Sequence, residues 1–188
     1  PHTGLFAAND QFYKGYNQKQ LTAKDFNTSF ISLIERNPPF EVKVLENNYG
    51  YVFLPGMLLL NAPQEELDEN SQMIYDAIMD LNEKHDLKGW IIDVRYNPGG
   101  NSNIMVTGLY HLLGNNTAYL YLDADKHLKA WTGLVDGTFY QNHEVYGKVK
   151  TRAKPDTEIP VALLTSVTTG SAGEFVVFAF RGRKNSIV

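Results

Sequence analysis

Two stretches after residue 39 alternate apolar and polar side chains. Val42 and Val44 alternate with charged residues within 40–45, and a second stretch covers 49–54 after a turn at Glu46-Asn47-Asn48. A period of two is typical of a half-buried strand, and a short polar link is typical of a turn between strands. The pattern therefore predicts two strands joined by a tight turn.

The spacing changes to that of a helix between residues 63 and 85. Apolar residues recur at Met73, Ile74, Ala77, Ile78 and Leu81. They are preceded by the acidic residues Glu65, Glu66, Asp68 and Glu69. Acidic side chains stabilise the positive N-terminal end of a helix, so this cluster predicts a helix start rather than a metal site.

Strands and helices alternate over the rest of the chain. The segments are a strand at 90–94, a helix at 104–112, a strand at 118–122, short strands and loops over 123–157, a strand at 159–164 and a helix at 173–181. The strand, glycine-rich turn, helix and strand within 90–122 predict a βαβ-like unit. Trp131, Phe139 and Tyr140 are the expected apolar anchors of 123–157. The fold class is α/β.

The first 39 residues have a different character from the rest. Phe26, Phe30, Ile31 and Ile34 have helical spacing and stop at Asn37-Pro38-Pro39, where proline disfavours the helix. We expect a small N-terminal helical segment, 1–39, before an α/β core, 40–188. Since the chain opens without a start methionine and 186–188 resembles a strand beginning, we expect a piece of a longer protein whose core is incomplete at its C-terminal end.

Composition narrows the function classes. The chain has 188 residues, no cysteine and a formal net charge of −4. Absence of cysteine excludes disulfides, a thiolate nucleophile and cysteine-ligated metals. Mild acidity argues against a nucleic-acid partner, which requires a basic face. No apolar stretch approaches the roughly 20 residues of a membrane span.

A serine lies in a turn of small residues between the last predicted strand and helix, at Gly170-Ser171-Ala172-Gly173. Free N–H groups at a helix start can hold an oxyanion, and small neighbours leave the hydroxyl accessible. However, Ser171 followed by Glu174 is also a capping box. The hydrolase pattern G-x-S-x-G is only half matched, because Thr169 replaces its first glycine. Spacing alone favours the cap.

A second candidate is Asn97-Pro98-Gly99-Gly100, directly after the strand at 90–94. Paired glycines at the carboxyl end of a strand can present N–H groups to a ligand. An ordinary tight turn into a helix accounts for the same residues. The turn lacks the phosphate-loop patterns G-x-x-x-x-G-K-[ST] and G-x-G-x-x-G.

Histidine is the usual general base for a serine hydroxyl, and His2 is a candidate. The other histidines are His85, His111, His127 and His143, for which we expect solvated helix or loop positions. None has a partner at metal-ligand spacing such as H-E-x-x-H. The basic residues Arg181, Arg183 and Lys184 are typical of a helix C-terminus, where cations are favoured.

Taken in order, these segments resemble the C-terminal processing peptidase family. The segments are Pro1-His2-Thr3, Tyr49-Gly50-Tyr51-Val52, Ile91–Gly100 with its D-x-R-x-N-P-G-G run, and Pro160–Thr165 leading to Gly170–Glu174. The family includes the tail-specific proteases, the tricorn protease core and the interphotoreceptor retinoid-binding protein repeats. The resemblance spans nearly the whole chain.

The resemblance implies a serine endopeptidase with an acyl-enzyme mechanism and Ser171 as nucleophile. It implies an oxyanion hole formed by the N–H of Ala172 with that of Gly99 or Gly100. It implies the fold of the Clp proteases and crotonases, built from stacked strand-strand-helix units. It implies no cofactor and no metal, a peptide or protein substrate, and an extracytoplasmic location; it leaves the oligomeric state open.

The identity of the base differs between branches of this family. Tail-specific members use a lysine some two dozen residues past the serine, beyond Val188, and Lys184 lies too close to Ser171 to take that role. Tricorn-like members use the histidine of a D-x-H-[ST] motif, and Pro1-His2-Thr3 matches its last three positions. We therefore expect His2 as the possible base, with an orienting glutamate again beyond Val188.

The spacing also bears on the peptide-binding PDZ module that tail-specific members carry. Only about 45 residues separate His2-Thr3 from Tyr49, fewer than a typical domain needs, so we expect the PDZ-less branch. We expect residues 1–188 alone to have little or no activity. The alternatives are a non-catalytic binder of a hydrophobic ligand or peptide on the same scaffold and, less favoured, a crotonase-like acyl-thioester enzyme.

Overall fold

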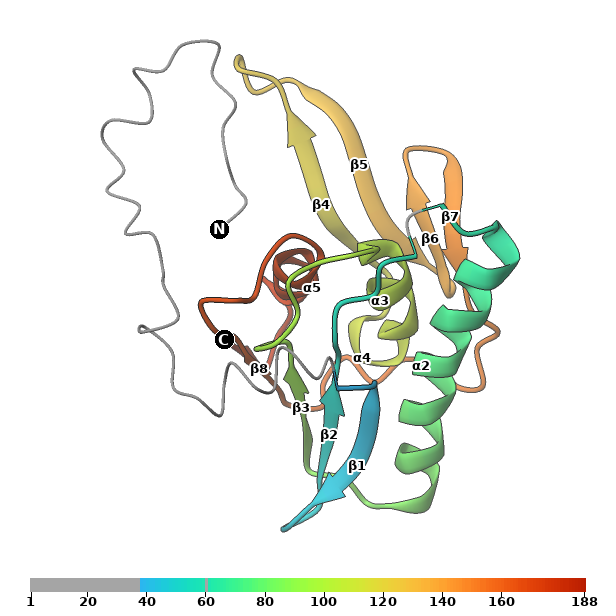
Figure 1. The fold of residues 1–188 in the computed structure, drawn as a ribbon, viewed down its shortest axis with the longest axis vertical. Coiled ribbons are helices and arrows are strands. Elements are labelled where there is room, and N and C mark those ends of the chain that lie inside the picture. The colour runs from blue at the N-terminus through green and yellow to red at the C-terminus, as the bar shows by residue number, and fades with distance from the viewer. Residues whose placement is uncertain (1–37, 60) are drawn as a thin grey trace.

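The computed structural model describes residues 38–59 and 61–188 of the chain (Figure 1). The elements are β1 (Glu41–Leu45), β2 (Tyr49–Phe53), α2 (Gln64–Lys84), β3 (Gly89–Asp93), α3 (Ser102–Gly108), α4 (Tyr110–Leu113), β4 (Asn116–Leu122), β5 (Leu128–Val135), β6 (Thr138–Gln141), β7 (Glu144–Lys148), β8 (Val161–Leu164), α5 (Ala172–Phe180) and β9 (Ser186–Ile187). The α/β class is confirmed, and so are the strands and helices expected from periodicity within the described residues, except that the helix expected at 104–112 is divided into α3 and α4. The N-terminal segment, 1–39, lies almost entirely outside the described residues.

A five-stranded sheet carries the loops of interest. Its order is β1-β2-β3-β8-β9; β1 and β2 are antiparallel, and the remaining neighbours are parallel. Asp93 at the end of β3 pairs with Leu164 at the end of β8. Because neighbouring parallel strands end at the same edge of a sheet, the loops after β3 and β8 leave the sheet side by side.

The predicted βαβ-like unit within 90–122 is wrong. β3 pairs with β8, and β4 instead starts a second sheet with the antiparallel order β4-β5-β6-β7. The links after β5 and β6 are short turns, and short links favour antiparallel hairpins over the crossover that parallel neighbours need. The long β4–β5 hairpin stands out from the body of the molecule in Figure 1.

The main core lies between the five-stranded sheet and the helices α2 and α3. Trp90 and Ile92 of β3 are buried against Ile74 and Ile78 of α2 in one apolar cluster. Close approach requires glycine at Gly108 of α3, where an added Cβ would lie 2.5 Å from the Cβ of Ile74. Phe139, the only fully buried one of the three expected anchors, extends this core under the second sheet.

The solvated position expected for His111 is wrong. His111 lies on α4, whose four residues are all buried, and it is only 3% exposed. Neither ring nitrogen has a hydrogen-bond partner in the described part of the chain. Burial lowers the pKa of His111, which favours the neutral imidazole. The neighbours of His111 in α4, Tyr110 and Leu112, are also buried, so this histidine lies inside the core.

Within the described residues, none of the helices is both long enough and apolar enough to cross a bilayer.

Candidate active site

Ser171 is the last residue of the loop 165–171 between β8 and α5, directly before the first helical turn. Its side chain is exposed, and its backbone angles are φ 48° and ψ −116°. A positive φ is costly for a residue with a Cβ, and such strain typically persists at functional positions. The strained strand-to-helix turn of G-x-S-x-G hydrolases exposes its serine in the same way.

The turn is stabilised from the helix side by Glu174. The Ser171 N–H donates to Oε2 of Glu174 at 3.0 Å, which is one half of the capping box. The N–H of Gly173 donates to the Gly170 carbonyl oxygen at 2.9 Å. The other half of the capping box is also present, with the Ser171 side chain facing the backbone N–H of Glu174. Glutamate thus holds the backbone of the turn while the hydroxyl stays accessible.

The loop that leads to Ser171 is hydrogen-bonded to the loop after β3. The Thr168 hydroxyl donates to the Arg95 carbonyl oxygen at 2.6 Å, and the Ser166 hydroxyl donates to the same oxygen. The Thr169 hydroxyl donates to the Val94 carbonyl oxygen at 2.8 Å. These three bonds fix the position of one loop relative to the other.

Both glycines of the Gly99-Gly100 pair are required by close approach and by positive φ. Gly99 has φ 135°, and a Cβ there would lie 2.9 Å from the Cβ and 3.3 Å from the Oγ of Ser171. Gly100 has φ 124°, and its added Cβ would lie 2.1 Å from the carbonyl oxygen of Met57. The structure therefore brings Gly99 directly against Ser171, while Gly100 lies against the backbone of Met57.

The hydrogen bonds of the turn distinguish the two glycines. The Gly99 N–H donates to Oδ1 of Asn97 at 3.0 Å. The Met57 N–H donates to the Gly99 carbonyl oxygen at 3.2 Å, and the Asn101 N–H donates to the Met57 carbonyl oxygen at 2.7 Å. Met57 therefore pairs with Gly100 in the pattern of parallel strands. In that pattern the N–H of Gly100 points away from Met57. Among the described residues, the N–H groups of Gly100 and Ala172 have no acceptor.

Asn97 is hydrogen-bonded to the segment after β2, to Gly99 and to Gly170, a role that sequence reasoning missed. Its side chain is fully buried, and Nδ2 donates to the carbonyl oxygens of Leu54 and Pro55, at 3.1 Å each. Its own carbonyl oxygen accepts from the N–H of Gly170 at 3.0 Å. The available signal was an asparagine directly before Pro-Gly-Gly at a strand end, since asparagine commonly hydrogen-bonds the backbone of turns.

Asp93 and Arg95 form an ion pair at the end of β3. Asp93 is 1% exposed, and Nη2 of Arg95 lies 2.7 Å from its Oδ2. The Tyr51 hydroxyl also donates to Oδ2, at 2.8 Å. Burial alone would raise the pKa of Asp93, but the hydrogen bonds from Arg95 and Tyr51 outweigh it and hold this pKa below its usual range. Asp93 is therefore an ionised structural group rather than a proton donor.

The remaining charged candidates are Lys184 and an acidic group on the β4–β5 hairpin. Lys184 lies four residues past the end of α5, a helix of nine residues and about 13 Å that separates it from Ser171. Asp123, Asp125 and His127 group their ligand atoms within 4.8 Å at the hairpin. Asp123 already accepts the N–H of Asp125 at 3.0 Å and that of His127 at 2.8 Å. These bonds form the hairpin turn.

His2 lies outside the described residues, so its distance from Ser171 is not defined.

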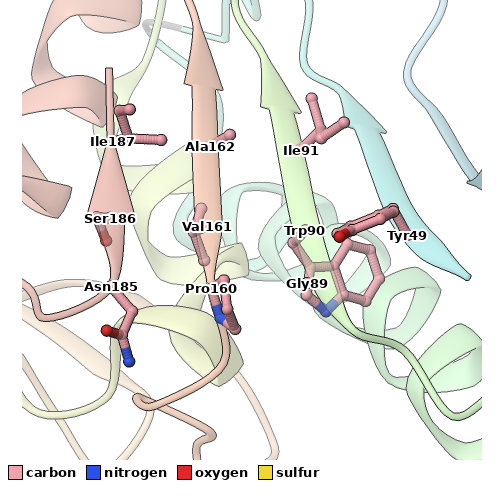
Figure 2. Close-up of a pocket in the computed structure, with 10 residues that line it drawn as sticks. All are labelled: Tyr49, Gly89, Trp90, Ile91, Pro160, Val161, Ala162, Asn185, Ser186 and Ile187. Carbon is pink, nitrogen blue, oxygen red and sulfur yellow. The ribbon is translucent and has the colours of Figure 1, made fainter.

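A separate apolar groove lies on the five-stranded sheet at the opposite end of β8 (Figure 2). Its volume is about 500 Å³, and the side chains of Tyr49, Ile91, Ala162 and Ile187 lie along it. Gly89, the first residue of β3, and Pro160, directly before β8, also line the groove. Since Ser171 follows the carboxyl end of β8, this groove is not the Ser171 site.

An exposed serine with a strained backbone at the start of a helix is a feature that this chain shares with α/β hydrolases. The family model of peptidase family S41 matches residues 48–188, and the chain belongs to this family. The resemblance to C-terminal processing peptidases is thereby confirmed.

The chain is also similar to individual known proteins. A nisin-resistance protein of Lactococcus lactis subsp. lactis is 30% identical over 133 residues, which are 68% of this chain and 40% of that protein. A lipoprotein from Streptococcus agalactiae has the same fold, with a TM-score of 0.58, 20% identity, and coverage of 84% of this chain and 50% of that one. The photosystem II D1 C-terminal processing protease has the same fold with a TM-score of 0.50 and 17% identity. The match covers 79% of this chain and 34% of that one. The chain thus spans half or less of the length of these relatives.

Proposed function

We propose that this chain carries the nucleophile and oxyanion hole of a serine endopeptidase. The observation that supports the proposal most strongly is the strained backbone of Ser171, with φ 48°, together with its exposed side chain. A plain helix cap does not need positive φ, because an N-cap residue ordinarily lies in the β region. Family membership makes peptide-bond hydrolysis the expected reaction class.

In the proposed reaction, Oγ of Ser171 attacks the carbonyl carbon of the substrate while its proton passes to a general base. The negative oxygen of the tetrahedral intermediate is held by the N–H groups of Ala172 and Gly100, the two that have no other acceptor among the described residues. The C–N bond then breaks as the base returns the proton to the amine. Water hydrolyses the resulting serine ester by the reverse sequence of proton transfers.

We assign the role of possible base to His2 and place the chain in the PDZ-less branch. The support is the Pro1-His2-Thr3 motif and the short interval of about 45 residues before Tyr49, less than a typical domain. Because the chain spans 50% of the Streptococcus agalactiae lipoprotein and 40% of the nisin-resistance protein, the complete activity belongs to the full-length protein.

We propose that the substrates are peptides and that the protein acts outside the cytoplasm. The support is family membership and the names of two relatives, a nisin-resistance protein and a lipoprotein.

The second candidate is a non-catalytic binder of a hydrophobic ligand or peptide. The apolar groove lined by Tyr49, Ile91 and Ile187 favours it, because an open apolar hollow on a sheet can accept such a ligand (Figure 2). A binder of this kind would lose its ligand on the substitution Ile91→Asp and would be indifferent to Ser171→Ala.

Labelling with a fluorophosphonate tests the peptidase proposal. The full-length protein is treated with the probe, and the adduct is located by peptide mass spectrometry. We expect modification of Ser171 that disappears in Ser171→Ala. Ser166→Ala is the matched control, because that hydroxyl lies in the same loop but donates to the Arg95 carbonyl oxygen. A folded full-length protein that is not labelled at Ser171 would refute the proposal.

A further inference from the structure

Aromatic side chains continue along α5 from Ser171. The N–H of Phe175 donates to the Ser171 carbonyl oxygen at 3.1 Å, so Phe175 lies one helical turn after Ser171, and Phe178 shares its face of the helix one turn further on. Phe178 is 41% exposed, and Phe175 is half-buried. The two rings meet edge to face with centroids 6.4 Å apart.

The hairpin strand β4 supplies the other side of this aromatic surface. In Figure 1, β4 lies above α5, and the Tyr119 and Phe175 rings pack with centroids 4.8 Å apart. Tyr121 shares the face of Tyr119, since the two rings meet edge to face at 6.3 Å. Tyr121 is 41% exposed. Four aromatic rings from two elements therefore form one continuous, partly open surface.

Tyr119 also reaches toward the glycine turn. Burial raises its pKa, and the side chain of Ser102, two residues after Gly100, lowers it by a smaller amount. The two hydroxyls do not reach hydrogen-bond geometry, so the buried Tyr119 oxygen has no partner among the described residues. Tyr119 thus packs on the helix that follows Ser171 through its contact with Phe175.

We propose that Tyr119, Tyr121, Phe175 and Phe178 form a subsite for an apolar, preferably aromatic, side chain of the peptide that Ser171 cleaves. The proposal rests on the proposed function. Its occupant is indicated by continuity with Ser171 along α5 and by the aromatic lining, because offset and edge-to-face ring pairs favour a further aromatic partner. A charged side chain would lose hydration there without a partner of opposite charge in the aromatic lining.

The dimensions define which substrate residue enters. At a rise of about 1.5 Å per residue, Phe175 lies about 6 Å and Phe178 about 10 Å along the helix from Ser171. An extended peptide advances about 3.3 Å per residue. For a peptide that runs along α5, the subsite therefore accepts a side chain two or three positions from the scissile bond.

Peptide binding to the Ser171→Ala form of the full-length protein tests the subsite without cleavage. Fluorescein-labelled peptides with X in the series Ala-Ala-X-Ala-Ala-Ala, where X is Phe, Leu, Ala or Asp, are titrated by fluorescence anisotropy. We expect the Phe peptide to bind about tenfold more tightly than the Ala peptide, the gain from partial burial of one aromatic side chain. The Asp peptide should bind most weakly.

The double substitution Tyr121→Ser and Phe178→Ser should abolish the Phe preference. Both side chains are 41% exposed, so the fold should tolerate the change. The matched control is Leu120→Ser: Leu120 is 54% exposed on the same strand but pairs with Trp131 on the opposite face, so the preference should persist.

The outcomes separate the two proposals. A Phe preference that survives the double substitution overturns the subsite, and so does a folded protein that binds none of the peptides. If Ser171 is labelled by a fluorophosphonate in either case, the peptidase proposal still stands. If Ser171 is not labelled but the preference depends on Tyr121 and Phe178, the peptidase proposal fails and the aromatic subsite stands as a peptide-binding site.

Discussion

The contact between Gly99 and Ser171 gives a quantitative test of the site. In Gly99→Ala the new Cβ would lie 2.9 Å from the Cβ of Ser171, well inside ordinary contact distance. Relief requires a displacement of about 0.5–1 Å, and a misplacement of about 1 Å can cost about 100-fold in rate. Alanine at φ 135° adds backbone strain of about 1–3 kcal/mol.

The assay is the second-order rate of fluorophosphonate labelling at Ser171, measured beside thermal unfolding of the same sample. We expect labelling of Gly99→Ala to slow by about 100-fold while the protein remains folded.

Gly182→Ala is the control for backbone strain. Gly182 also has positive φ, 92°, but an added Cβ would meet nothing within 4 Å. Its substitution should lower stability by a similar amount and leave labelling unchanged. If folded Gly99→Ala is labelled as fast as Gly182→Ala, the proposed geometry of the site is wrong.

Three further substitutions test separate parts of the arrangement. Asn97→Ala removes the hydrogen-bond partner of the Leu54 and Pro55 carbonyl oxygens and of the Gly99 N–H. Since each buried unpaired group costs about 1–3 kcal/mol, the free energy of unfolding measured in urea should fall by about 3 kcal/mol or more. The folded pKa of Asp93 is depressed, so its stabilisation is present above the unfolded pKa of about 3.9 and is lost as pH falls through the lower folded value. Unfolding measured at neutral and acidic pH should therefore show a smaller acid-induced loss in Asp93→Asn than in wild type. Ser171→Gly should raise the free energy of unfolding by about 1 kcal/mol, because glycine adopts φ 48° without a steric clash at Cβ. It should also abolish labelling, because the hydroxyl is removed. A loss of stability would instead indicate that Ser171 is a simple helix cap.

Local patterns predicted the individual elements because each pattern has a local physical cause. The alternation around Val42 and Val44 gave β1, and the polar turn after it gave the start of β2. The helical spacing of Ile74 and Ile78 gave α2, whose interior face they form.

The errors arose where the answer depends on distant parts of the chain. Nothing within 90–122 indicates that β3 pairs with β8 while β4 pairs with β5. His111 is polar by type, but the apolar residues on both sides of it bury the whole of α4. The sequence also left Gly99 and Gly100 equivalent, because the difference between them comes from Asn97 and Met57.

The ambiguity of Ser171 illustrates the same limit in the site itself. A serine three residues before a glutamate is compatible with both a cap and a nucleophile, and the structure contains the Glu174 hydrogen bond that the cap requires. The two roles differ in backbone conformation rather than in residue type. A cap alone has no reason to adopt φ 48°, whereas a nucleophile gains an exposed hydroxyl beside the glycine turn and next to the N–H of Ala172. Glu174 then contributes to the site by holding Ser171 in a conformation that the serine alone would avoid.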